Sequence, residues 1–192
     1  MFDRGFRTWC ETTSLQVRHQ LGIGSSSPLN VEALAEYVGV RLLTPEQVQG
    51  LSPSSLHTLL SSEKDGWSAI TISRGDKDIV IYNSAHSPRR RSSDLTHELA
   101  HLLLRHRPST MHFIADASMA LRSYDQKQEE EANWLAGCLL LPRPALLDIA
   151  GSSANHAAIC QLYNVSSALL AMRLNVSGVN IQVKRRRQRS KG

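Results

Sequence analysis

The segment that most restricts the fold of this chain is SSDLTHELAHLLLRH, residues 92–106. Its leucines and Ala100 recur at helical spacing, which predicts a helix that is largely buried. The same helix carries His97, Glu98 and His101 in an H-E-x-x-H pattern. Buried polar side chains without partners are costly, so the fold must supply a partner for each of these three.

The spacing of the two histidines predicts a metal site. Residues four apart on a helix lie about 40° apart around its axis, so His97 and His101 can turn ring nitrogens toward one ion. Zinc binds such nitrogens at about 2.0–2.1 Å. Glu98 lies beside the first ligand, where a carboxylate can take the proton of a zinc-bound water. An ordinary core helix with incidental histidines would leave Glu98 unexplained.

A catalytic zinc site needs a third protein ligand and an open position for water. The longer pattern H-E-x-x-H-x-x-G-x-x-H is not continued, because Leu104 and Arg107 follow the motif at the relevant positions. The third ligand must therefore come from elsewhere. The best candidates lie in YDQKQEEEANWLAGCLLLP, residues 124–142, which is predicted to form a second helix.

Three consecutive glutamates stand near the start of this second helix. Measured from the inward-facing Ala132, Glu129 lies about 60° away, Glu131 about 100° and Glu130 about 160°. Glu129 therefore leans toward the core, and Asp125 is better suited to cap the helix. Favourable charge in the first turn explains all three glutamates equally well, so geometry leaves the role of Glu129 open.

The remaining elements can be predicted from periodicity and from turn and cap residues. Asn30 suits a helix N-cap, and Gly39 suits the position after that helix. The predicted elements are a helix at 2–21, a helix and strand within 29–43, a hairpin with strands 68–73 and 78–83, short helices at 144–150 and 155–162, a helix-turn-helix-like pair ending at Gly178, and a strand at 179–183.

Charge is concentrated at the end of the chain. The formal net charge is +5, and the segment KRRRQRSK, residues 184–191, contributes six positive charges, so the remainder stands at −1. A disordered, solubilising tail is the favoured interpretation, and contact with nucleic acid is the alternative.

The cysteines and the apolar runs indicate the cellular setting. The three cysteines, Cys10, Cys138 and Cys160, form no C-x-x-C pair, so neither a disulfide framework nor a cysteine zinc site is expected. The first residues contain no apolar signal-peptide core, and no apolar run approaches the ~18 residues that span a bilayer. We therefore expect a cytoplasmic protein without membrane contact.

Four stretches together resemble the ImmA/IrrE family of zinc metallo-endopeptidases. They are FRTWCETTSLQVRHQLGI, PLNVEALAEYVGVRLLTPEQVQGL, DIVIYNSAHSPRRRSSDLTHELAHLLLRH and QEEEANWLAGCLLLP. The resemblance covers roughly residues 6–178. It departs from the family pattern at Asp94, near a usual Phe-Thr pair, and at Leu135, where the family has Phe; neither change removes a ligand.

The resemblance implies roles for four residues. His97, His101 and Glu129 match the family's zinc ligands, and Glu98 matches its catalytic glutamate. The implied fold is α+β and zincin-like, a small sheet packed with helices, with strand 78–83 near the cleft. We expect a peptidase domain at 1–150, a helical extension at 151–180 and a disordered basic tail at 181–192. An oxyanion-stabilising group is also expected, with Tyr82, His106 and His112 as candidates.

The implied activity is zinc-dependent cleavage of a regulatory protein, often a helix-turn-helix repressor encoded next to the peptidase in bacteria, phages or mobile elements. Two alternatives remain. The chain could be a zinc-bound regulator without catalysis that binds DNA or a repressor, or the toxin of a toxin–antitoxin pair. The sequence does not indicate the oligomeric state.

Overall fold

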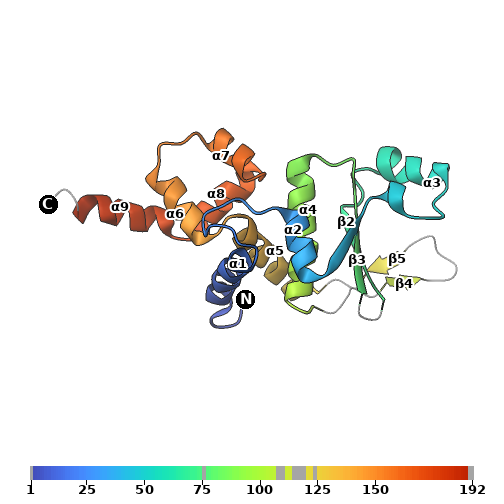
Figure 1. Cartoon of the computed structure of the whole chain (residues 1–192), viewed down its shortest axis with the longest axis horizontal. Helices are drawn as coiled ribbons and strands as arrows, with labels where there is room; N and C mark the ends of the chain where they lie inside the picture. Colours follow the sequence, from blue (N-terminus) through green and yellow to red (C-terminus); the bar gives the residue numbers. More distant parts are fainter. Residues whose placement is uncertain (1, 75–76, 107–110, 114–119, 123–124, 190–192) are drawn as a thin grey trace.

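The computed structural model describes residues 2–74, 77–106, 111–113, 120–122 and 125–189, with the backbone alone at 73–74, 111–113 and 120–122. It is α+β, as predicted (Figure 1). The helices are α1 (Phe6–Gln20), α2 (Val31–Val38), α3 (Pro53–His57), α4 (Pro88–Leu103), α5 (Gln126–Leu140), α6 (Arg143–Gly151), α7 (His156–Leu162), α8 (Ser167–Val176) and α9 (Val179–Arg189), with short turns η1 (Pro45–Gln47) and η2 (Thr58–Ser62). The strands are β1 (Val40–Leu43), β2 (Ala69–Arg74), β3 (Lys77–Tyr82), β4 (Met111–Phe113) and β5 (Ala120–Arg122).

The main sheet has three strands in the order β1-β3-β2. The predicted hairpin is confirmed: β2 pairs antiparallel with β3 from Ala69↔Tyr82 to Arg74↔Lys77, while its turn residues 75–76 lie outside the described part. β1 pairs parallel with β3 on the other side. The segment expected near the cleft, 78–83, is thus the central strand, and β2 is the edge strand that contacts α4.

Local side-chain caps define where helices begin. The Asn30 side chain accepts from the Ala33 N–H at 2.8 Å, and Asp125 accepts from the first turn of α5, as predicted. The start of α4 is corrected: it begins at Pro88 rather than near residue 92, because Ser87 caps it and proline suits the first helical position. Asp94 therefore lies in the second turn, 2.9 Å from His86 Nδ1.

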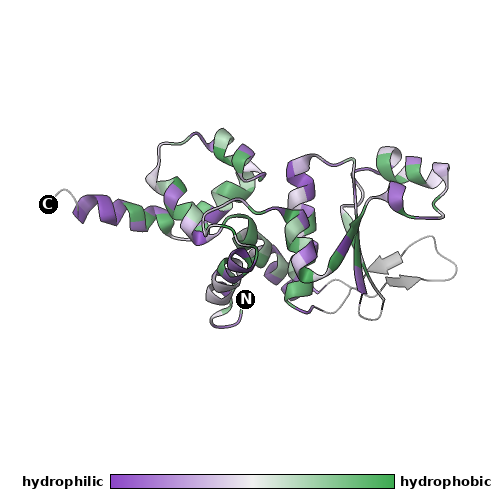
Figure 2. Ribbon diagram, in the orientation of Figure 1, coloured by the Kyte–Doolittle hydropathy of each residue, from purple (hydrophilic) through white to green (hydrophobic). Residues whose placement is uncertain are grey.

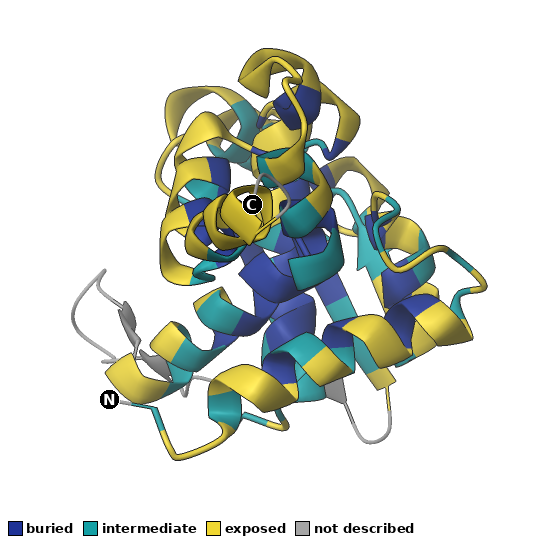
Figure 3. Cartoon of the chain, turned by 90° about the vertical axis from the view of Figure 1, so that its left-hand side faces the viewer, coloured by how far each residue is buried: buried dark blue, intermediate teal, exposed yellow. Residues whose placement is uncertain are grey.

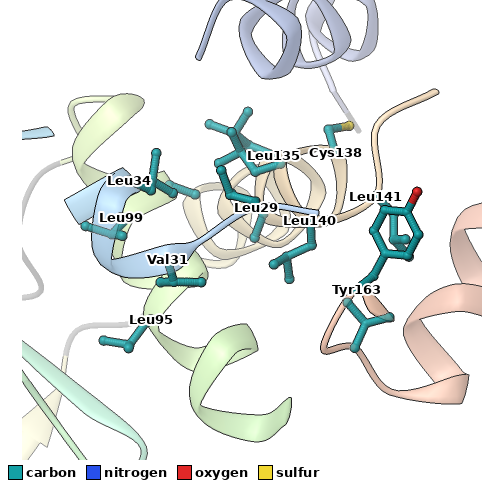
Figure 4. Packing of buried hydrophobic residues seen from close by; sticks show 14 of the residues in the cluster. Leu29, Val31, Leu34, Leu95, Leu99, Leu135, Cys138, Leu140, Leu141 and Tyr163 are labelled. Atoms are coloured by element: carbon teal, nitrogen blue, oxygen red, sulfur yellow. The ribbon is translucent and has the colours of Figure 1, made fainter. Parts of the chain in front are cut away.

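The core lies where α4 packs on α5, with α2 and the sheet covering α4 (Figures 1 and 4). Leu95 and Leu99 of α4, and Leu135 and Leu139 of α5, are at most 3% exposed. Each buried leucine stabilises the fold by about 1.5–3 kcal/mol relative to an exposed one. The inward faces predicted for both helices are thus the faces that are buried.

Buried donors satisfy the carbonyls in the last turn of α5. Ser14 Oγ donates to the Cys138 carbonyl at 2.7 Å, and Arg18 Nη2 donates to Leu139 at 2.7 Å. Arg173 Nη2 of α8 donates to the Leu141 carbonyl at 3.0 Å. Burial lowers the pKa of Arg18 to about 10, so this guanidinium is still charged at neutral pH. Positive charge at a helix C-terminus also suits the helix dipole.

A small residue makes room for the second arginine. A Cβ at Gly137 would lie 3.0 Å from Arg173 Cδ, so the arginine stem crosses α5 at its glycine. Arg173 Nη2 also donates to Glu11 Oε1 of α1 at 2.7 Å, and the other oxygen of Glu11 accepts from the Arg143 N–H at 3.0 Å. One carboxylate therefore joins α1 to both α6 and α8.

The last helix corrects two predictions. Residues 179–183 form no strand, and residues 181–189 are not a disordered tail: both belong to α9, which projects from the α6–α8 group with a polar outer end (Figures 1 and 2). Val179 is buried, and Arg143 Nη2 donates to Gln182 at 2.8 Å, so tertiary contacts favour the helix. In the view of Figure 3 the outer surface of α9 is largely exposed. Residues 190–192 lie outside the described part.

The three cysteines are free and buried. A hydrogen bond with Cys10, together with burial, raises the pKa of the Cys138 thiol, which therefore stays protonated. Across the described residues, no single helix is both long and apolar enough to cross a membrane, and α5 and α6, bent by 57°, would meet that test only as a pair.

The hydrogen bonds at the end of α5 can be tested with Ser14→Ala. The change removes a donor to the Cys138 carbonyl and an acceptor for Arg18, so we expect the free energy of unfolding to fall by about 2 kcal/mol. Urea unfolding of the metal-free protein measures it. The control Ser167→Ala, at an exposed position, should stay within about 0.5 kcal/mol of the parent. Equal effects of the two changes would refute the anchoring role.

Candidate metal centre

Three donor side chains from α4 and α5 meet at one point. His97 Nε2 lies 3.1 Å from Glu129 Oε2 and 3.0 Å from His101 Nε2, and His101 Nε2 lies 3.5 Å from Glu129 Oε1. These are the residues that the sequence and the resemblance single out as ligands. Two imidazoles and a carboxylate at this spacing could hold a metal ion.

The helix geometry explains this meeting. The histidines stand one turn apart on α4, and Glu129 stands in the first turn of α5, whose apolar face packs against α4. The three side chains are 18–21% exposed, so they are neither sealed in the core nor free in solvent. The site is held by the core on one side and remains accessible to a ligand on the other.

The outer ring nitrogen of His97 is also engaged. His97 Nδ1 lies 3.1 Å from Asn133 Oδ1, one turn after Glu129 on α5. An amide oxygen can only accept, so Nδ1 carries the proton and Nε2 presents its lone pair to the centre. Asn133 thus holds His97 in the tautomer that a metal ligand requires.

Glu98 follows His97 directly on α4, about 100° further around the helix, and its side chain contacts the sheet. Its residue is 9% exposed, and its Oε2 accepts a short hydrogen bond of 2.5 Å from Thr71 Oγ1 on β2. A hydroxyl donor orients a carboxylate while leaving its second oxygen available. Thr71 therefore gives the candidate base the partner that its burial demands.

The other candidate residues do not join the three donors. Glu130 is exposed and accepts from Gln126, away from the centre. Tyr82 ends β3 and lines a cavity of about 280 Å³ with residues of α2 and the start of α4. His106 contacts His101 at Nδ1, the nitrogen that faces away from Glu129. His112 lies on β4, where the backbone alone is described. The oxyanion group stays a prediction without a chosen residue.

Two residues of the site were not predicted as partners from the sequence. Thr71 is predicted there only as part of a β-strand, and its distance of 27 residues from Glu98 gives no sign of their contact. The sequence assigns no role to Asn133 beyond its place in the stretch QEEEANWLAGCLLLP, although it stands four positions after Glu129 and therefore on the same helix face. That spacing was a usable signal.

Comparison with known proteins finds one family. The model of the Peptidase_M78 family, described as the IrrE N-terminal-like domain, matches residues 51–175. The matched part contains α4 and α5 with all three donors, as well as Glu98 and Thr71. No curated protein matches the sequence.

The metal centre can be tested through Glu129→Ala with Zn²⁺ as the probe. We expect zinc affinity to fall by more than about 100-fold, because losing a ligand exceeds the 10–100-fold effect typical of outer-shell changes. Competition with a chromophoric chelator measures it. Glu130→Ala is the matched control and should bind zinc like the parent, since its carboxylate faces Gln126. Unchanged zinc affinity in Glu129→Ala would exclude Glu129 as a ligand.

Proposed function

Because this chain belongs to the IrrE N-terminal-like family of M78 peptidases, we propose that it is a zinc-dependent endopeptidase that cleaves a regulatory protein. The family itself indicates a metallopeptidase-type domain. The observation that carries the proposal is the meeting of His97, His101 and Glu129 beside a buried glutamate on the same helix.

Zinc fits the donor set. Ligands bound tetrahedrally at about 2.0–2.2 Å lie about 3.3–3.6 Å from one another. The nitrogens and oxygens of the three side chains are 3.0–3.5 Å apart, close to those edges. A set of three protein ligands also leaves a fourth position for water, which is typical of catalytic rather than structural zinc. His97, His101 and Glu129 would hold the ion.

In the proposed reaction Glu98 moves the proton. Bound zinc would polarise the scissile carbonyl and lower the pKa of the attacking water. Glu98 takes the proton from that water and returns it to the leaving amine. Thr71 keeps the carboxylate of Glu98 in one orientation through this cycle.

The sheet offers a place for the substrate backbone. β2 pairs with β3 on one side, and its Thr71 faces α4 at the centre. Ile70 and Ile72, which flank Thr71, are 40% and 46% exposed. An extended peptide that adds to this strand would pass close to Glu98, in the manner of strand addition.

The substitution Glu98→Gln tests the catalytic role. It keeps the shape of the side chain but removes the base, so we expect peptide cleavage to be abolished while zinc stays bound with nearly unchanged affinity. New protein N-termini that form in cells on induction of the parent, and not of the variant, measure cleavage. If the Glu98→Gln variant still controls the activity of the regulatory protein as the parent does, the peptidase proposal is refuted.

The same measurement separates the proposed substrate classes. Only the family resemblance supports a helix-turn-helix repressor as the substrate. If that is the substrate, new N-termini should form in one protein. A toxin would produce new N-termini in many proteins. For either substrate class, we propose that the protein acts in the cytoplasm.

A second candidate function, contact with nucleic acid through α9, is favoured by the charge distribution. No aspartate or glutamate follows Asp148 in the sequence. Lys184, Arg185, Arg186, Arg187 and Arg189 are exposed on α9. Phosphate is the natural partner of such a surface, and the binding would depend steeply on salt.

Replacing these five cations by glutamine tests the second candidate. Duplex DNA binding should weaken, and the slope of log affinity against log salt should shrink by about 1 for each phosphate that the variant no longer neutralises. Fluorescence anisotropy across a salt series measures both. A matched control replaces the exposed Arg41 and Lys77 of the sheet and should leave binding unchanged. If the parent shows no salt-dependent binding, α9 is only a solvated helix.

A further inference from the structure

The second ring nitrogen of His101 does not face solvent or an amide. His101 Nδ1 lies 2.9 Å from His106 Nδ1, while His101 Nε2 faces His97 and Glu129. Direct contact between two histidine nitrogens requires one to donate and the other to accept. The order of protons along this pair therefore decides which nitrogen of His101 is available to a metal.

A carboxylate continues the chain. His106 Nε2 lies 3.3 Å from Glu131 Oε2, and the two side chains are 8% and 14% exposed. Lys127 Nζ, one turn earlier on α5, lies 3.8 Å from Glu131 Oε1 and holds it from the solvent side. The series His101, His106 and Glu131 thus runs from the metal centre to a largely buried carboxylate.

Only one arrangement of protons satisfies the chain when a metal takes His101 Nε2. The remaining ring proton of His101 must then lie on Nδ1 and be donated to His106 Nδ1. His106 must in turn carry its proton on Nε2 and donate it to Glu131, which can only accept. Every hydrogen bond points toward the carboxylate, and each ring adopts a single neutral tautomer.

We propose that His106 and Glu131 are positioning residues of the metal centre that hold His101 in its metal-binding tautomer and orientation. A ligand histidine that donates its other N–H toward a carboxylate is more basic and better oriented than a free one. This inference rests on the proposed function in one respect, namely that His101 is a ligand. It adds two residues that neither the H-E-x-x-H pattern nor the glutamate ligand contains.

The backbone after α4 supports this role. Arg105 has φ of 54°, and within the described residues Asn164 is the only other non-glycine with positive φ. The left-handed conformation costs a non-glycine residue about 1–2 kcal/mol. The Arg105 N–H donates to the Leu102 carbonyl and the His106 N–H to the His101 carbonyl, both at 3.0 Å, which is the Schellman ending of a helix. With this ending, the ring of His106 lies against that of His101.

The two ligand histidines are therefore supported differently. His97 Nδ1 is held by the neutral amide of Asn133, which is exposed. His101 Nδ1 is held by His106, whose side chain is 8% exposed and contacts the carboxyl group of Glu131. The carboxyl group of Glu131 can therefore influence the metal centre by way of His106 and His101.

The test measures Zn²⁺ affinity by chelator competition, and unfolding of the metal-free protein, in three variants. His106→Leu removes both hydrogen bonds and should weaken zinc binding by about 10–100-fold. His106→Gln retains an acceptor for His101 and a donor for Glu131, and should recover most of that loss. Glu131→Gln keeps an acceptor but removes the charge, and should weaken zinc binding less than His106→Leu.

Controls separate positioning from general stability. His19→Leu changes an exposed histidine of α1 and should leave zinc affinity unchanged. The proposal is overturned if His106→Leu binds zinc like the parent, or if His106→Gln is as weak as His106→Leu. It is also overturned if the loss of affinity only follows a loss of metal-free stability. If the parent does not bind zinc, the proposed function itself is refuted, and the positioning role of His106 and Glu131 is refuted with it.

Discussion

The packing of α4 against α5 is the contact on which the rest of the structure depends. Leu95 and Leu99 on one helix and Leu135 and Leu139 on the other are buried in the same core. Close packing of these side chains fixes how each helix is rotated about its axis, because a rotation would open voids or force clashes. Fixed rotation is what brings donors of both helices to one point, since a site of this kind tolerates errors of only about 0.5 Å.

Several features of the site follow from this single contact. The faces of α4 and α5 that meet just beyond the leucines carry His97, His101 and Glu129, and the next polar positions on α5 carry Asn133 and Glu131. Glu98, about 100° around α4 from His97, contacts the sheet through Thr71. The same two helices therefore carry the buried leucines on one face and the metal donors on a neighbouring face.

Features set by neighbours in sequence could be predicted, and features set by distant contacts could not. The caps at Asn30 and Asp125 and the hairpin of β2 and β3 depend on adjacent residues, and all were found from the sequence. Helical spacing also identifies the two histidines, whereas it leaves the role of Glu129 open, and only the family resemblance marks Glu129 as a ligand. Periodicity does not encode how elements pack against one another. Three features depend on that packing: the order of the strands, the contact of Thr71 with Glu98 and the helical state of α9.

The arginine that crosses Gly137 bears on where this protein could be divided. The expected boundary near residue 150 separates α5 from Arg173, although Arg173 supplies donors to the Leu141 carbonyl and to Glu11. A fragment that ended at that boundary would lose both of these hydrogen bonds and would expose the Leu141 carbonyl to solvent. The C-terminal helices thus help to hold the end of α5, the helix that carries Glu129. We therefore expect the two regions to unfold together, as one cooperative unit.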